Sequence, residues 1–224
     1  MKVPLPIILF AALVPFISGC PLTPGSDSGP DVSGNDADVL QVDNLFAADP
    51  DSPGHFIFQT NDPAWWGPYG YTLWALKGAP LSPFVSRQVQ VNKVSGDSAA
   101  GYGVVFCHYD TGDPAVGETM LVAMIDTQRE FIVGEVTGAS FSEILPWTES
   151  TFLSRGYNQA NVMKVTYDAG EKEFALFLNG GEAARFRDDS GPFHDAGGGN
   201  GYIVVISPRD DFPHAPVHVI FQEQ

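Results

Sequence analysis

Acidic side chains are the most plentiful groups in this sequence that could do chemistry, since 27 of its 224 residues are Asp or Glu. Hydrolysis of a glycosidic bond needs two carboxyl groups that face each other, about 5 to 9 Å apart. Glu171 and Glu173 have the spacing that shares a strand face, but they flank a turn at Gly170. The other pairs of acidic residues are separated by a loop or are adjacent residues whose side chains would point in opposite directions. We expect solvated charge rather than a catalytic pair at Glu135 with Glu143, Asp188 with Asp189, and Asp210 with Asp211.

Patterns for nucleophiles and metal ligands are weak. No Gly-x-Ser-x-Gly turn is present to expose a catalytic serine. His214 and His218 have the spacing of a helical metal-binding pair, but Pro213 and Pro216 exclude a helix there. Cys107 lies in an apolar run that is typical of a strand, where a buried thiol behaves as a small apolar side chain. We therefore expect no catalytic residue, no metal ligand and no cofactor.

Aromatic residues have the clearest binding chemistry. Three of the four tryptophans lie within residues 62–74, among prolines and glycines. Aromatic rings stack on the apolar faces of sugars, and a stiff loop presents them at low entropic cost. Large aromatic side chains more commonly fill a core, and this alternative stays open. The hypothesis of ligand contact concerns four positions: Trp65, Trp66, Tyr69 and Trp147.

The charge balance excludes one class of partner. The chain has 11 Lys and Arg residues against 27 Asp and Glu residues, a formal net charge of −16 at pH 7. Such a surface repels the phosphates of nucleic acids, so nucleic acid is not an expected partner. The same charge keeps an exported protein soluble. Hydrophobic residues make up 44% of the chain, which is enough for a sizeable core in one domain.

The N-terminus predicts export. Lys2 is followed by an apolar stretch from Val3 to Ile17 and then by small residues. This order is typical of a signal peptide, and prolines interrupt a stretch that is already too short to span a membrane. We expect residues 1–19 to be the signal peptide.

Ile17-Ser18-Gly19-Cys20 resembles the lipobox of bacterial lipoproteins, although Leu is more usual where Ile17 stands. The resemblance implies cleavage before Cys20 and acylation of its thiol by fatty acids such as palmitate. The chain would then be anchored in a membrane of the bacterial cell envelope. Pro21 is not the Asp associated with retention in the inner membrane, which favours the outer membrane or the cell surface. The alternative is an ordinary secretory signal.

Residues 20–54 differ in composition from the rest of the chain. They are rich in Pro, Gly, Ser, Asn and Asp and contain no Lys or Arg. Such a segment buries too little apolar surface to fold, so we expect a flexible acidic tether after Cys20. Two short apolar patches, Val39–Val42 and Leu45–Phe46, could dock on the domain and make the boundary approximate. We place the folded domain at residues 55–224.

From residue 55 onward the pattern favours β-strands. Apolar residues do not recur at helical spacing, and Gly and Pro separate short apolar runs. Within residues 84–94, valines alternate with polar residues such as Gln88 and Gln90, so the valine set should be buried. Nine strands of an antiparallel β-sandwich are predicted, at residues 84–94, 102–109, 120–126, 129–135, 162–167, 173–178, 182–186, 202–207 and 217–221.

The succession of these runs resembles a known superfamily. Gly101–Phe106 is followed by the hairpin of Leu121–Ile125 and Phe131–Gly134, and Phe177–Gly180 and Gly199–Val205 come later. Over residues 80–222 this order resembles the concanavalin A-like jelly rolls, in particular their laminin G-like domains. The resemblance implies an all-β jelly-roll fold.

The resemblance implies less about function, because that superfamily includes lectins, glycosidases and adhesion modules. Its glucanases carry a Glu-x-Asp-x-x-Glu strand, which this sequence lacks. Its laminin G-like domains often hold calcium at the rim. Asp110 and Asp113 offer oxygen ligands in a loop, while a plain Asp/Gly turn is the alternative.

We therefore expect a membrane-anchored envelope lipoprotein whose sandwich binds carbohydrate or a protein and does no catalysis. Its expected partners are the membrane, through Cys20, and a glycan or an envelope protein. Two alternatives stay open. The domain could be a glycoside hydrolase or a degenerate glucanase-like relative, or it could be a structural component of the envelope.

Overall fold

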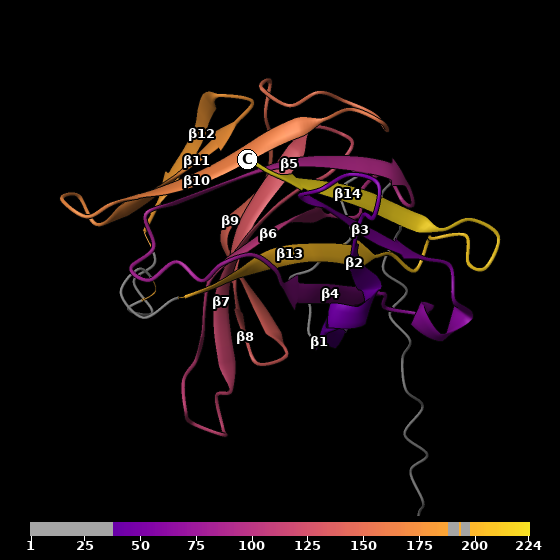
Figure 1. The fold of residues 1–224 in the computed structure, drawn as a ribbon, viewed down its shortest axis with the longest axis horizontal. Helices are drawn as coiled ribbons and strands as arrows, with labels where there is room; N and C mark the ends of the chain where they lie inside the picture. The colour runs from indigo at the N-terminus through magenta and orange to yellow at the C-terminus, as the bar shows by residue number, and fades with distance from the viewer. Residues whose placement is uncertain (1–37, 188–192, 194–197) are drawn as a thin grey trace, which may run out of the picture.

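The computed structural model describes residues 38–187, 193 and 198–224, and these residues are almost entirely β-structure. Their strands form two seven-stranded sheets packed as a sandwich (Figure 1). Among these residues no helix is long and apolar enough to cross a membrane. The expected signal peptide, Cys20 and the first part of the expected tether lie outside the described residues, as do Asp188 and Asp189.

Sheet A has seven strands, and four of them, within residues 102–149, form a meander of consecutive neighbours. Its order is β1 (Asp38–Gln41), β4 (Tyr71–Leu76), β13 (Gly199–Ile206), β6 (Tyr102–Asp110), β7 (Glu118–Ile125), β8 (Glu130–Thr137) and β9 (Ser140–Glu149). The β1–β4 pair is parallel, and the other neighbours in this sheet are antiparallel.

Sheet B is antiparallel throughout. Its order is β12 (Gly181–Phe186), β11 (Glu173–Leu178), β10 (Asn161–Asp168), β5 (Ser86–Ser95), β14 (Val217–Glu223), β3 (His55–Thr60) and β2 (Phe46–Ala48). Two short 3-10 helices, η1 (Asp43–Leu45) and η2 (Pro63–Trp65), lie in connections. Figure 1 shows the C-terminus beside β5 and β10.

The core lies between the two sheets and is rich in aromatic side chains. Phe106 of sheet A lies 5.9 Å from Phe174 of sheet B, measured between ring centroids. Tyr202 of β13 and Phe221 of β14 stack at 4.3 Å. Full burial of such a ring contributes about 1.5–3 kcal/mol, so these contacts across the layers are the main attraction between the sheets.

The structure corrects the expected domain boundary at residue 55. Residues 38–41 pair with β4, and residues 46–48 pair with β3. Phe46 is buried in the core, 5.0 Å from the ring of Phe58, and Val39 is also buried. The apolar patches in the expected tether are therefore strands of the sandwich, because burial of a few large side chains outweighs the polar composition around them.

All nine predicted strands are present, with ends that shift by a few residues. In β5, Val89 and Val91 are buried as expected, while Val85 precedes the strand and is 66% exposed. Five strands were not predicted: β1, β2, β3, β4 and β9. Of these, β1, β2 and β9 lie at sheet edges. The edge strand β9 contains Pro146, which lacks a backbone donor and is tolerated at a sheet edge.

Gly103 and Gly201 allow close packing of strands within sheet A, and Gly201 provides a test of this packing. A Cβ at Gly201 would lie 1.8 Å from the carbonyl oxygen of Ala75, closer than atoms can approach. We expect Gly201→Ala to lower the free energy of unfolding by about 2–3 kcal/mol, because the strands must separate. Denaturant unfolding followed by tryptophan fluorescence measures this change.

Gly198→Ala is the matched control, because a Cβ there meets nothing closer than 3.8 Å. It should unfold at nearly the same denaturant concentration as the unmodified protein. Equal stability of the two variants would contradict the packing described for β13.

Candidate functional site

The outer face of sheet B, which is turned away from the core, is a grid of polar side chains. In β5 the residues Val89 and Val91 point into the core, so Gln88 and Gln90 point outward. In β10 the same alternation places Lys164 outside, between the buried Met163 and Val165 of the core face. The face is thus built by strand periodicity, which the sequence of β5 already indicated.

Strand register aligns four of these side chains in one row. Lys164 lies directly opposite Phe177 of β11 on one side and opposite Gln88 of β5 on the other. Glu223 pairs with Val89, which brings Gln224 next to Gln88. We call Phe177, Lys164, Gln88 and Gln224 the Lys164 row. Since neighbouring strands lie about 4.8 Å apart, the row extends over about 14 Å.

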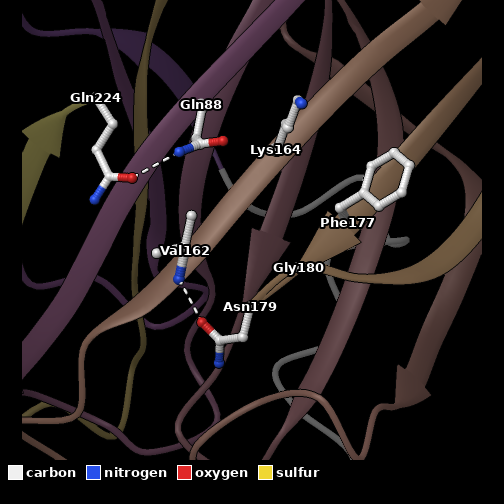
Figure 2. A pocket seen from close by; sticks show the side chains of 7 residues that line it. All are labelled: Gln88, Val162, Lys164, Phe177, Asn179, Gly180 and Gln224. Atoms are coloured by element: carbon white, nitrogen blue, oxygen red, sulfur yellow. Dashed lines mark hydrogen bonds between the residues drawn. The ribbon is translucent and has the colours of Figure 1, made fainter.

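Amide groups line one end of the row. Gln88 Nε2 donates a hydrogen bond to Gln224 Oε1 at 2.7 Å (Figure 2). One step along the strands, Gln90 Nε2 donates to Gln222 Oε1 at 2.9 Å. Because each amide has two donors and a carbonyl acceptor, a paired glutamine retains hydrogen-bonding capacity for a ligand.

The Lys164 row lines a hollow in the protein surface of about 550 Å³, together with Val162, Asn179 and Gly180. A second hollow of about 440 Å³ shares Gln88, Lys164 and Gln224 with the first. The shared residues make the two hollows one groove, with Lys164 at their junction. Figure 2 shows Lys164 between Gln88 and Phe177, with Val162 and Asn179 on the other side of the hollow.

The turn at Asn179-Gly180 fixes one wall of the groove. Both residues have positive φ, 48° and 85°, as the tight turn after β11 requires. Asn179 Oδ1 accepts a hydrogen bond from the Val162 backbone amide at 2.7 Å, and its Nδ2 donates to the Phe152 carbonyl at 2.8 Å. These bonds hold the turn against β10.

The second hollow has one acidic side chain among its described lining residues, that of Glu223, and this side chain is already paired. Arg87 donates to Glu223 Oε1 at 2.9 Å, and the Tyr202 hydroxyl donates to the same oxygen. Arg87 is itself buried and lies 5.3 Å from the Tyr202 ring centroid. Glu223 is therefore held in place as part of the structure.

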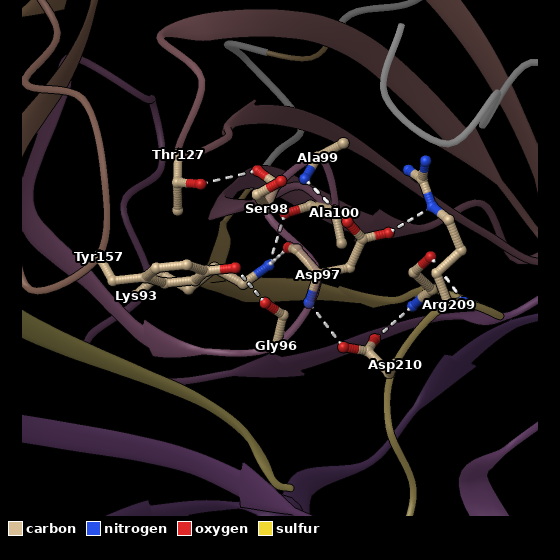
Figure 3. A network of polar contacts seen from close by, with 11 residues as sticks. Lys93, Gly96, Asp97, Ser98, Ala99, Ala100, Thr127, Tyr157, Arg209 and Asp210 are labelled. Atoms are coloured by element: carbon tan, nitrogen blue, oxygen red, sulfur yellow. Dashed lines mark hydrogen bonds and ion pairs between the residues drawn. The ribbon is translucent and has the colours of Figure 1, made fainter. Parts of the chain in front are cut away.

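A different polar network closes the end of the sandwich where β5 meets β6. Lys93 is fully buried, and its Nζ donates to the carbonyl oxygens of Asp97 at 2.6 Å and Ala100 at 2.8 Å. Asp97 accepts a bond from Arg209 at 2.8 Å, and Asp210 accepts from the Asp97 backbone amide at 2.7 Å (Figure 3). Burial lowers the pKa of Lys93 to about 8, although Asp210 and Asp97 oppose this shift.

The structure brings together three of the four aromatic residues predicted to bind a ligand. Trp65, Trp66 and Tyr69 lie in the loop between β3 and β4, outside the groove. Trp65 is half-buried and packs edge-on against Tyr71, with centroids 5.9 Å apart. Trp66 is 50% exposed and Tyr69 is 64% exposed. Contact between these two rings and a ligand stays a prediction.

Trp147 does not join that loop. It lies on β9, and four strands of sheet A separate β9 from β4. Trp147 packs, half-buried, against a second apolar cluster that includes Met124 and Ile132. The packing shows a structural role for this ring, while ligand contact there stays a prediction.

Three further candidates from the sequence, Asp110, Asp113 and Glu173, form separate contacts. Asp110 and Asp113 accept hydrogen bonds from the backbone amides of Gly112 and Ala115, as in ordinary Asp turns. Glu173 forms ion pairs with Arg185. Within the described residues, no group of three or more His, Cys, Asp or Glu side chains could hold a metal ion.

The sequence indicates little of the groove. Its alternation within residues 84–94 indicates that Gln88 lies on the polar face of a strand, but no local pattern marks Lys164, Phe177 or Gln224 as binding residues. These residues come from three segments far apart in the chain, and only strand register brings them together. Two sequence signals could have indicated part of the groove: the polar alternation of residues 86–92, and the polar position of Lys164 between Met163 and Val165 in another predicted strand.

Comparisons with known proteins show the fold. Neither a protein-family model nor a curated protein matches this sequence. A Bacteroides ovatus GH16 protein from a mixed-linkage glucan locus, solved with a G4G4G3G product, matches with TM-score 0.54 and 6% identity, over 81% of this chain and 84% of that chain. A prokaryotic β-1,3-1,4-glucanase (lichenase) from a mouse hindgut metagenome matches with TM-score 0.53 and 11% identity, over 87% and 89%.

A structure described as a native glycosidic hydrolase matches with TM-score 0.51 and 8% identity, over 86% of this chain and 85% of that chain. At such identities the likeness concerns the fold alone. The predicted fold class is confirmed: the described residues form an all-β jelly-roll sandwich.

The Lys93 network predicts a dependence of stability on pH. The folded-state pKa of about 8 is below the ordinary value of 10.5, so the unfolded chain binds more protons between these values. The free energy of unfolding should therefore gain a contribution of about 2 kcal/mol between about pH 8 and 9.5. Urea unfolding at the two pH values measures this gain.

Lys93→Met is the comparison for this experiment. It should be less stable at pH 7, by about 2–4 kcal/mol, because two buried carbonyls lose their donor. It should also lack the gain between pH 8 and 9.5. An equal gain in both proteins would show that Lys93 is not the group that titrates.

Proposed function

We propose that this protein is a lipid-anchored component of the bacterial cell envelope whose β-sandwich binds carbohydrate without catalysis. The observation that carries the proposal is the Lys164 row on the outer face of sheet B, set in a hollow of about 550 Å³. The groove combines an aromatic ring, several amides and one cation on the rigid strands of a sheet.

This combination of groups suits a sugar. Hydroxyl groups donate and accept hydrogen bonds, and the amides of Gln88, Gln224 and Asn179 do both in return. The ring of Phe177 offers an apolar face to the C–H groups of a sugar ring. Fixed polar groups around an apolar patch are typical of small-molecule sites, and they limit the entropy lost on binding.

The same groove supports binding rather than hydrolysis. A glycosidase needs two carboxyl groups across the scissile bond. Among the described residues that line the two hollows, Glu223 has the one acidic side chain, and Arg87 and Tyr202 hold it. The fold likeness to glucanases carries no argument for catalysis at 6–11% identity.

The proposed anchor is compatible with an accessible groove. The described chain enters the sandwich at Asp38, in β1 at the edge of sheet A. The groove lies on the outer face of sheet B, the other layer. A lipid on Cys20, joined to β1 through the preceding residues, would therefore hold the domain through one layer and leave the other available to a glycan.

Binding can be tested on the chain without residues 1–19 that carries Cys20→Ser. We expect selected polysaccharides on a glycan array to bind it, and Phe177→Ala and Gln88→Ala each to weaken binding by about tenfold, the equivalent of about 1.4 kcal/mol. Isothermal titration calorimetry with the best array ligand measures the affinities.

Gln59→Ala is the matched control, because Gln59 is an exposed amide on β3 of the same sheet, outside the groove. It should bind as well as the unmodified chain. Trp66→Ala tests the aromatic loop in parallel. Loss of binding in Trp66→Ala, with unchanged binding in Phe177→Ala, would move the site from the groove to the loop and contradict the proposal.

The anchor has its own test. Full-length protein expressed in a bacterial host should incorporate an alkyne-labelled palmitate and sediment with membranes. Cys20→Ser should lose both properties, while Cys107→Ala, which changes the second of the two cysteines, should keep them. Label that persists in Cys20→Ser, or that is absent from the unmodified chain, would contradict lipidation at Cys20.

A further inference from the structure

The groove holds a cation without an ion-pair partner, in a protein with a large excess of acid. The chain has 27 Asp and Glu residues against 11 Lys and Arg residues. Most of the other described cations have a partner: Arg87 pairs with Glu223, and Arg209 with Asp97. No ion pair joins Lys164 to a carboxylate of the described residues.

The lack of an ion-pair partner matters at Lys164 because of where this residue lies. Exposed lysines such as Lys172 need no partner, because water solvates them. Lys164 is half-buried at the junction of the two hollows, with Phe177 on one side and Gln88 on the other. Its ammonium therefore lies within the surface that a ligand would cover.

The neighbours of Lys164 suit an anion. The side chains that line the hollow of about 550 Å³ are neutral apart from Lys164, and they include the amides of Gln88, Asn179 and Gln224. The carboxylate of Glu223, in the adjoining hollow, is neutralised by Arg87. The net charge of −16 repels a polyanion at long range, but a single carboxylate inside the groove would contact one ammonium and amide N–H donors, and no unpaired acidic side chain among these lining residues. Charge-assisted hydrogen bonds of this kind are about twice as strong as neutral ones.

We propose that the ligand of the groove is an acidic glycan, a polysaccharide that contains uronic acid, whose carboxylate binds Lys164. This inference rests on the proposed function, because it names the class of sugar that the same groove takes. The Phe177 ring and the amides bind the sugar ring and its hydroxyls, and Lys164 selects the charged sugar over its neutral counterpart.

The test compares an oligogalacturonate with its methyl ester, which has the same backbone without the charge. The chain without residues 1–19 that carries Cys20→Ser should bind the acid about tenfold more tightly than the ester in calorimetric titrations in about 0.1 M NaCl, where long-range repulsion by the net charge of −16 is largely screened. This preference should shrink in about 0.5 M NaCl, because salt screens the charge interaction.

Lys164→Gln removes the charge and keeps a polar side chain of similar length. It should bind acid and ester equally, with the affinity of the unmodified chain for the ester. Lys172→Gln, an exposed lysine in the β10–β11 turn, is the matched control and should keep the full preference. Thermal unfolding of each variant checks that it is folded.

The outcomes separate this inference from the function on which it rests. Gln88-dependent binding of neutral glycans, with no preference for the acid, would overturn the acidic-glycan assignment and leave carbohydrate binding intact. A preference that survives Lys164→Gln, or tighter binding of a sulfated glycan than of the uronate, would overturn it as well. If no glycan binds, the proposed function fails together with the assignment.

Discussion

The antiparallel register between β5 and β10 is the constraint on which the rest of the structure depends. It aligns Val89 with Met163 on the core side and Gln88 with Lys164 on the outer side. Because side chains alternate with a period of two, a shift by one residue would turn the valines to solvent and the amides into the core. Burial of Val89, Val91 and their partners therefore also determines the position of the polar groove.

Charged residues extend the same strand beyond its apolar centre. Arg87 and Lys93 lie on the buried face of β5, near its two ends. Arg87 is held by Glu223 and the Tyr202 ring, whereas Lys93 binds the carbonyls of the β5–β6 loop. Loss of a partner in either place would leave a buried charge unsatisfied, which is costly. These two networks therefore fix the loop and the C-terminal strand that border the sandwich.

Much of the fold could be predicted from the sequence, because alternation and turn residues are local signals. The alternating valines of β5 are an example, because Val89 and Val91 are buried as expected. Strands β1 and β2 were missed because their few apolar residues, such as Phe46, lie in an Asp-rich segment. Strand β9 was missed because Pro146 and its acidic neighbours resemble a loop.

The groove could not be predicted in the same way. Its residues are ordinary for exposed strand faces, and their proximity depends on pairing between distant segments. The hypothesis that the tryptophans bind a ligand depended on their residue type and on the loop sequence around them, not on any pairing between strands. Trp65 and Trp147 prove to be half-buried in packing contacts, whereas Trp66 and Tyr69 are exposed, as a ligand contact would require.

The most direct test of carbohydrate binding in the groove is an NMR titration of the 15N-labelled domain with a glycan that binds. Side-chain amide signals of Gln88, Gln224 and Asn179 should shift, while the indole signal of Trp66 stays in place. Shifts of the Trp66 indole, with unchanged signals from the three amides, would contradict the account and place the ligand in the loop between β3 and β4.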